Sequence, residues 1–129
     1  MIALPFQLAS SVVATGAADV VVSVGGAAIT PELFPDGGRA GRVRLEATLA
    51  ATGTGWVTAL LGEERPDGTV RPLARTRLLR SVTTRQTLRS ERQVVTLRRG
   101  VVRLVVLARA GVANGTLLGP VVLVERATA

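Results

Sequence analysis

Three acidic residues, Glu63, Glu64 and Asp67, form the only local group of side chains in the sequence that could carry acid–base chemistry. Paired carboxylates act as acid and base in glycoside hydrolysis, and carboxylate oxygens also bind calcium. The group surrounds Pro66-Asp67-Gly68, a strong turn signal, so a solvated turn is the favoured interpretation. A weak calcium site at this turn, or at Asp36, is the alternative, although the spacing does not match a standard calcium-binding loop.

The amino-acid composition argues against most other catalytic mechanisms. The chain of 129 residues contains no His and no Cys, so the commonest general base and the soft metal ligands are missing. All 16 basic residues are Arg, so no Lys could activate a Ser or Thr nucleophile. The glycine groups at 25–26, 37–38 and 53–55 do not open a helix after a strand, as a phosphate-binding loop would, and are interpreted as turns. We therefore expect a non-enzymatic protein with no cofactor and no bound metal.

The most distinctive feature is an arginine-rich stretch between Arg71 and Arg99, which contains a single acid, Glu91. Three interpretations stay open: a solvated sheet face, a protein interface, and a nucleic-acid surface. Arg is enriched at protein interfaces, whereas single-strand binders usually interleave aromatic side chains, which this stretch lacks. Nucleic acid is therefore the least favoured partner. The candidate interface residues in this stretch are Arg77, Arg80, Arg85, Arg89 and Arg92.

Aromatic residues are scarce, with two Phe, one Trp and no Tyr. Phe6 and Phe34 are predicted to be core or interface plugs, and both are candidate interface residues. Trp56 is predicted to anchor the core, because a lone Trp offers little surface on which a sugar ring could stack.

The pattern of the chain predicts an all-β fold. Gly and Pro recur about every ten residues, Val and Thr favour strands, and residues 42–51 alternate between apolar and polar side chains. We expect one domain over residues 1–129, built as an antiparallel two-sheet sandwich with jelly-roll-like connections and eight or nine strands. Pro72 marks an edge strand, and Gly119-Pro120 marks a bulge or an edge. A single short helical turn is predicted near Pro31–Phe34, with Thr30 as its cap.

The N-terminal segment, residues 1–18, carries no charged side chain. It lacks the positive start of a signal peptide, and no apolar run in the chain approaches the length of a membrane helix. We expect either the first strand of the domain or an arm that docks on a neighbouring subunit, and no contact with a membrane.

The order of these features resembles small β-sandwich virion proteins of tailed bacteriophages, such as head decoration and minor tail proteins. The resemblance rests on an N-terminal apolar strand followed by these segments: 29–34 (ITPELF), 43–49 (VRLEATL), 53–61, the Arg/Ser/Thr segment 80–92, 94–97, Gly100, 101–107 and 115–124. The later half is also similar to galactose-binding-type jelly rolls. Their last strand often carries an acid near its start, where this chain has Leu118-Gly119-Pro120-Val121.

The resemblance implies a structural protein of a bacteriophage particle, located in the virion. It implies a capsid decoration or stabilisation protein that binds the major capsid protein or other virion proteins and forms a homo-oligomer, with a trimer favoured. A tail, collar or fibre component is one alternative, and a carbohydrate-binding β-sandwich module is the other. The net charge of +7 favours acidic partners in each case.

Overall fold

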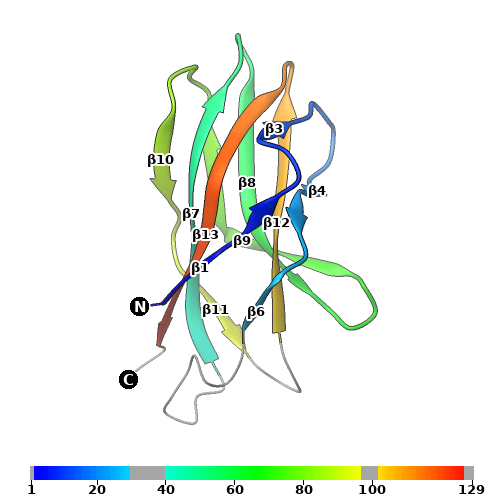
Figure 1. Cartoon of the computed structure of the whole chain (residues 1–129), viewed down its shortest axis with the longest axis vertical. Coiled ribbons are helices and arrows are strands. Elements are labelled where there is room, and N and C mark those ends of the chain that lie inside the picture. Colours follow the sequence, from blue (N-terminus) through cyan, green and yellow to red (C-terminus); the bar gives the residue numbers. More distant parts are fainter. Residues whose placement is uncertain (1, 30–39, 97–101, 127–129) are drawn as a thin grey trace.

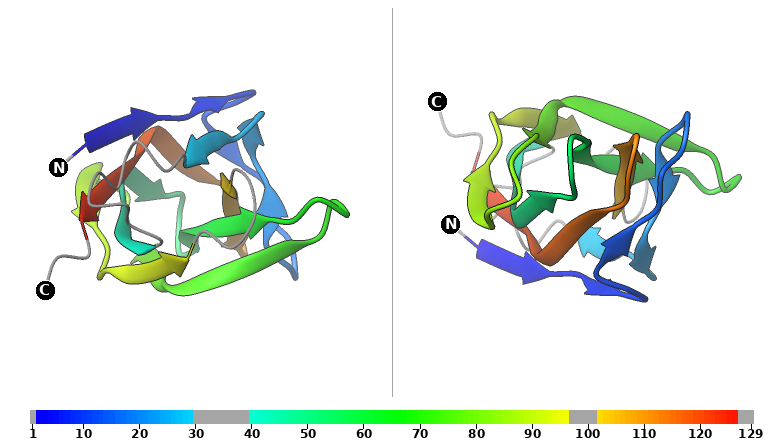
Figure 2. Two further views of the ribbon diagram at one scale, coloured as in Figure 1. Left: turned by 90° about the horizontal axis from the view of Figure 1, so that it is seen from below. Right: turned by 90° about the horizontal axis from the view of Figure 1, so that it is seen from above.

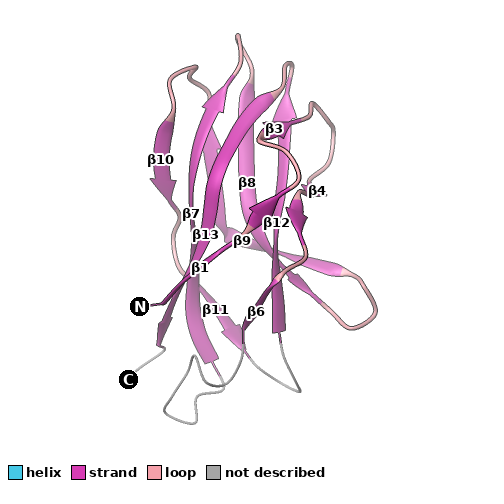
Figure 3. Ribbon diagram, in the orientation of Figure 1, coloured by secondary structure: helices cyan, strands magenta, loops and turns pink. Residues whose placement is uncertain are grey.

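The protein is an all-β, sandwich-like structure of antiparallel sheets (Figure 1). A computed structural model describes residues 2–29, 40–96 and 102–126. These residues contain no helix (Figure 3), and therefore none long and apolar enough to cross a membrane. The prediction of an all-β fold with antiparallel sheets is confirmed. The helical turn predicted near Pro31–Phe34 lies outside the described residues.

The first sheet has six strands among the described residues. These are β1 (Ile2–Pro5), β3 (Val12–Val13), β7 (Ala40–Ala51), β10 (Gln86–Arg89), β11 (Gln93–Thr96) and β13 (Gly115–Arg126). The long strands β7 and β13 pair at the centre, β10 and β11 pair with β7, and β1 and β3 pair with β13. The register of β13 shifts between Leu118 and Val121, where Gly119 has a positive φ of 53°. The predicted bulge at Gly119-Pro120 is therefore confirmed, because glycine adopts this conformation without strain.

The second sheet has five strands among the described residues. These are β4 (Val20–Val21), β6 (Ala27–Ile29), β8 (Trp56–Glu64), β9 (Val70–Arg80) and β12 (Val102–Gly111). Strand β12 pairs with β4, β6 and β8, and β8 is the one partner of β9 in the part of the chain that the structure describes. The expectation that Pro72 marks an edge strand is confirmed, because an edge strand tolerates a residue without an N–H group. The tip of the β8–β9 hairpin projects away from the rest of the molecule (Figure 1).

The N-terminal part of the chain runs along one side of the sandwich, between β13 and β12 (Figure 2). After β1, the strands β2 (Gln7–Leu8) and β5 (Ser23–Val24) pair with each other as a small third sheet. The Val22 N–H donates to the Val106 carbonyl at 2.9 Å, and the Gly16 N–H donates to the Ala110 carbonyl at 3.0 Å. The N-terminal segment therefore belongs to the fold as a series of short strands that tie the two sheets together.

The two sheets share one core made almost entirely of Val, Leu and Ala side chains. In β7, the apolar residues of the predicted alternation are all buried, with Val43, Leu45 and Leu49 at 0% exposure. The intervening Arg44 and Glu46 are only half-buried and lie on the outer face. The alternation therefore predicts the two faces of this strand correctly.

Strand β9 carries a large irregularity opposite Leu60. Between the pairs Ala59–Leu78 and Leu61–Leu73, β8 advances by two residues while β9 advances by five. The side chain of Thr76, at 0% exposure, occupies the irregularity: its Oγ1 accepts a hydrogen bond from the Leu61 N–H at 2.9 Å and donates one to the Leu73 carbonyl at 2.6 Å. The hydroxyl thus binds two backbone groups at the point where the ladder is distorted.

Thirteen strands are described, where the sequence predicts eight or nine. The N-terminal region accounts for most of the difference, because residues 2–24 alone form five short strands. Strand β10 was not predicted, because its sequence (QTLR) has only one large apolar side chain, Leu88. Its place depends on backbone pairing with β7.

Candidate functional site

Trp56 lies on the outer face of the second sheet, so the prediction that it anchors the core is wrong. Its neighbours Val57 and Ala59 on the same strand are core residues, which turns Trp56 and Thr58 to the opposite face. The indole packs on the backbone of Gly111, its partner across the strand pair: a Cβ atom built on that glycine would lie 2.2 Å from Trp56 Cε2. Because Gly111 has no side chain, the indole ring can lie directly against the backbone of the neighbouring strand. The residue is half-buried.

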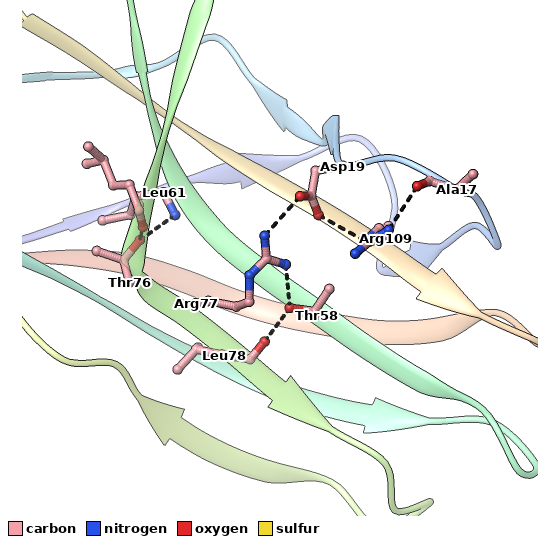
Figure 4. A network of polar contacts seen from close by, with 9 residues as sticks. Ala17, Asp19, Thr58, Leu61, Thr76, Arg77, Leu78 and Arg109 are labelled. Atoms are coloured by element: carbon pink, nitrogen blue, oxygen red, sulfur yellow. Dashed lines mark hydrogen bonds and ion pairs between the residues drawn. The ribbon is translucent and has the colours of Figure 1, made fainter.

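Arg77, Arg109 and Asp19 form a cluster on this side of the sheet (Figure 4), and Arg109 lies beside the indole. Asp19 Oδ2 accepts a hydrogen bond from Arg77 Nη2 at 3.0 Å, and Asp19 Oδ1 lies 3.6 Å from Arg109 Nε. The Arg109 guanidinium carbon lies 5.3 Å from the centroid of the Trp56 ring, which is within reach of a cation–π interaction. These residues come from three segments: the turn before β4, strand β9 and strand β12.

Backbone and hydroxyl groups fix the two arginines further. Arg77 Nη1 donates to Thr58 Oγ1 at 3.0 Å, and that buried hydroxyl donates to the Leu78 carbonyl at 2.8 Å. Arg109 Nη1 donates to the Ala17 carbonyl at 2.8 Å. The guanidinium groups are therefore preorganised on the sheet, while their side chains stay about one third exposed, at 37% for Arg77 and 33% for Arg109.

A surface pocket of about 530 Å³ opens over this cluster. Its lining consists of Trp56, Thr58, Arg77, Leu79, Ser81 and Arg109. Leu79 is 63% exposed, which is unusual for a leucine and adds an apolar wall beside the indole. An aromatic plane, an apolar wall and two guanidinium groups converge here, which is the composition of a binding site for a small ligand.

The candidate interface arginines do not all lie on one surface, although two of them line one groove. Arg77 belongs to the Trp56 pocket, and with Arg89 it also lines a second groove, of about 600 Å³, between β9 and β10. Arg89 pairs with Glu46 at 3.1 Å on the outer face of the first sheet. The Arg80 side chain is hydrogen-bonded within the chain, because its Nε donates to the Thr84 carbonyl at 2.9 Å.

The remaining candidates are separated as well. Arg92 pairs with Glu125 at 3.3 Å, and Arg85 is an exposed residue of the β9–β10 connection. Phe6 is partly buried and packs against the core, and Phe34 lies outside the described residues. An interface role for any of these residues stays a prediction.

A second surface feature lies on the N-terminal side of the sandwich. Five large apolar side chains of the first 24 residues are well exposed: Ile2 at 39%, Val12 at 55%, Val20 at 56%, Val21 at 48% and Val24 at 54%. We call these five residues the apolar flank. The segments that carry them run along one side of the molecule (Figure 2). Exposed apolar side chains can form an interaction surface where they lie together, so these segments are a candidate for one.

The acidic turn has the structure expected of a solvated turn. The Thr69 N–H and hydroxyl both donate to Asp67 Oδ1, at 2.9 Å and 2.6 Å. The hydrogen bond from the Thr69 hydroxyl, helped by the backbone N–H, lowers the pKa of the Asp67 carboxyl below its usual value of 3.8. Within residues 2–29, 40–96 and 102–126, no three potential metal ligands gather in one place.

Comparison with family models, curated proteins and solved structures finds no match for the chain.

Proposed function

We propose that the protein is a non-enzymatic structural component of a bacteriophage particle, a decoration or stabilisation protein that self-associates and binds the capsid shell. The proposal starts from the likeness of the strand and turn order to small virion proteins. Jelly-roll-like connections belong to the same proposal, and they are supported by the chain changing sheets after β7, after β9, after β11 and after β12. A tail, collar or fibre position is the alternative within it.

The observation that carries the proposal is the apolar flank. Asp19 is the only charged residue in the first 29 residues, and its carboxylate is paired with Arg77 and Arg109. The segment that carries the flank therefore contributes no charged side chain other than Asp19, and an apolar composition with few charges is typical of the centre of a protein interface. A second copy of the chain is the occupant we propose, because the uncharged flank avoids the repulsion that the net charge of +7 creates elsewhere between copies.

The first test is the mass of the protein in solution, measured by light scattering after size exclusion over a range of concentrations. We expect a trimer, with three times the chain mass of 13.4 kDa. The double variant Val20→Arg, Val24→Arg places two charges in the flank and should give a monomer. Val94→Arg is a matched control: Val94 has the same 56% exposure as Val20 but lies on β11, in the first sheet, so this variant should stay trimeric.

The second test concerns the particle itself. Purified particles of the virus that encodes the chain should carry it in many copies, and decoration of bare shells should follow the oligomeric state of the variants. A wild-type protein that stays monomeric at every concentration and does not sediment with capsid shells contradicts the proposal. Labelling at the tail instead of the shell would select the alternative.

A further inference from the structure

We propose that the pocket beside Trp56 binds a small organic carboxylate, with Arg77 and Arg109 holding the carboxylate and the indole contacting the apolar body of the ligand. This inference does not depend on the assembly proposal, because the pocket lies on the outer face of the second sheet and its lining shares no residue with the apolar flank.

The charge of the cluster favours an anion. Two guanidinium groups face a single carboxylate, that of Asp19, so the cluster keeps one unbalanced positive charge. A ligand with one carboxylate would neutralise it. Arginine presents a planar fork of donors that matches a carboxylate, so the class of anion follows from the same side chains.

The hydrogen bonds of Arg109 leave room for such a ligand. Its contact with Asp19 is 3.6 Å, too long for a hydrogen bond, and its Nε has no acceptor among the described residues. Its one hydrogen bond among these residues is from Nη1 to the Ala17 carbonyl. Nη2 has no acceptor among the described residues, and we assign its donors to the ligand.

Asp19 already shows the binding mode within the chain. Its carboxylate arrives from the N-terminal segment, far from β9 and β12 in sequence, and lies between the two arginines (Figure 4). A ligand carboxylate in the pocket would bind the same two guanidinium groups from the solvent side. Asp19 is thus an internal competitor, and its removal should strengthen binding of an external carboxylate.

The walls of the pocket select for a ligand with an apolar body. The volume of about 530 Å³ falls within the range of small-molecule sites and is much larger than a bare carboxylate needs. Trp56 and Leu79 supply apolar surface, while the hydroxyls of Thr58 and Ser81 border it. A carboxylate on a planar or apolar body should therefore bind better than acetate.

The chain provides its own reporter for the test. Trp56 is the only Trp and Tyr is absent, so indole emission, excited at the red edge of its absorption, reports on this pocket alone. The wild-type protein would be titrated with benzoate, with its neutral isostere benzamide, and with acetate, and calorimetry would confirm each response. We expect saturable binding of benzoate, weaker binding of acetate, and no saturable response to benzamide.

Variants then assign the response to residues. Arg77→Gln and Arg109→Gln should each weaken benzoate binding by roughly tenfold or more, as expected for the loss of a charged hydrogen bond. Asp19→Asn should strengthen it by roughly fivefold, the upper range for a partly exposed ion pair. Arg71→Gln, an exposed arginine of β9 outside the pocket lining, is the control and should bind as the wild type does.

Any one of three results overturns the proposal: an equal response to benzamide, unchanged benzoate affinity in both pocket arginine variants, or no saturable binding of benzoate by either the wild type or Asp19→Asn. Circular dichroism of every variant checks that the fold is retained. Failure here would leave the oligomeric state and shell binding unaffected, so the two proposals fail separately.

Discussion

Replacing Thr76 by Val should destabilise the protein strongly, although the two side chains have nearly the same shape. Thr76 is fully buried, and its hydroxyl is hydrogen-bonded to the Leu61 N–H at 2.9 Å and to the Leu73 carbonyl at 2.6 Å. Val fills the same space but cannot form either bond. The two backbone groups would then be buried without a partner, because Leu61 is 0% exposed and Leu73 is 1% exposed.

The size of the effect follows from these two groups. A buried backbone group that loses its partner costs about 1–3 kcal/mol, and two such groups set a range of about 2–6 kcal/mol. The methyl group that replaces the hydroxyl recovers about 0.8 kcal/mol. We therefore expect the free energy of unfolding to fall by about 2–4 kcal/mol, since some relaxation of the irregular strand is possible.

Urea denaturation followed by circular dichroism measures this loss, and Thr76→Ser is the matched control. Serine keeps both hydrogen bonds and removes one methyl group, so its cost should be about 1 kcal/mol. A Val variant that is no less stable than the Ser variant would refute the argument, because the methyl group and not the hydroxyl would then stabilise the irregularity.

Two further perturbations test local features of the turn and of the indole. Thr69→Val should raise the pKa of Asp67 toward 3.8 in a carbon-detected NMR titration, because the lowered pKa comes first from the Thr69 hydroxyl. The pKa of Asp67 is lower in the folded protein than in the unfolded chain. The stability linked to Asp67 is therefore present above the unfolded pKa and is lost as the pH falls through the folded pKa. The Thr69→Val variant should lose this acid sensitivity. Gly111→Ala should displace the Trp56 indole and shift its emission, whereas Gly16→Ala should not, because the nearest atom to a Cβ on Gly16 is 3.9 Å away.

Regular strands were predictable because their side chains alternate. The core face of β7 follows directly from the sequence of residues 42–51, and the bulge in β13 follows from Gly119-Pro120. Strand β10 and the short N-terminal strands were not predictable in this way, since backbone pairing and tertiary contacts place them. A two-residue strand such as β3 is too short to show any period.

The candidate site was harder to predict because its residues are brought together by tertiary structure. A lone Trp among few aromatics suggested a core residue, yet its position depends on Gly111, more than fifty residues away along the chain. One signal was available: Asp19 is the only charge in a long uncharged segment, and a charge beside a run of valines needs a partner. The sequence does not reveal which arginines supply it.

The irregularity in β9 connects the stability of the fold to the site. Leu73 and Leu78 are five residues apart, so in a regular strand they would face opposite sides, yet both are buried in the core. The extra residues opposite Leu60 reverse the alternation, and this reversal brings Arg77 and Leu79 to the outer face beside Trp56. The Thr76 hydroxyl stabilises the reversal, so Thr76→Val should also weaken benzoate binding at the pocket, although Thr76 does not line it.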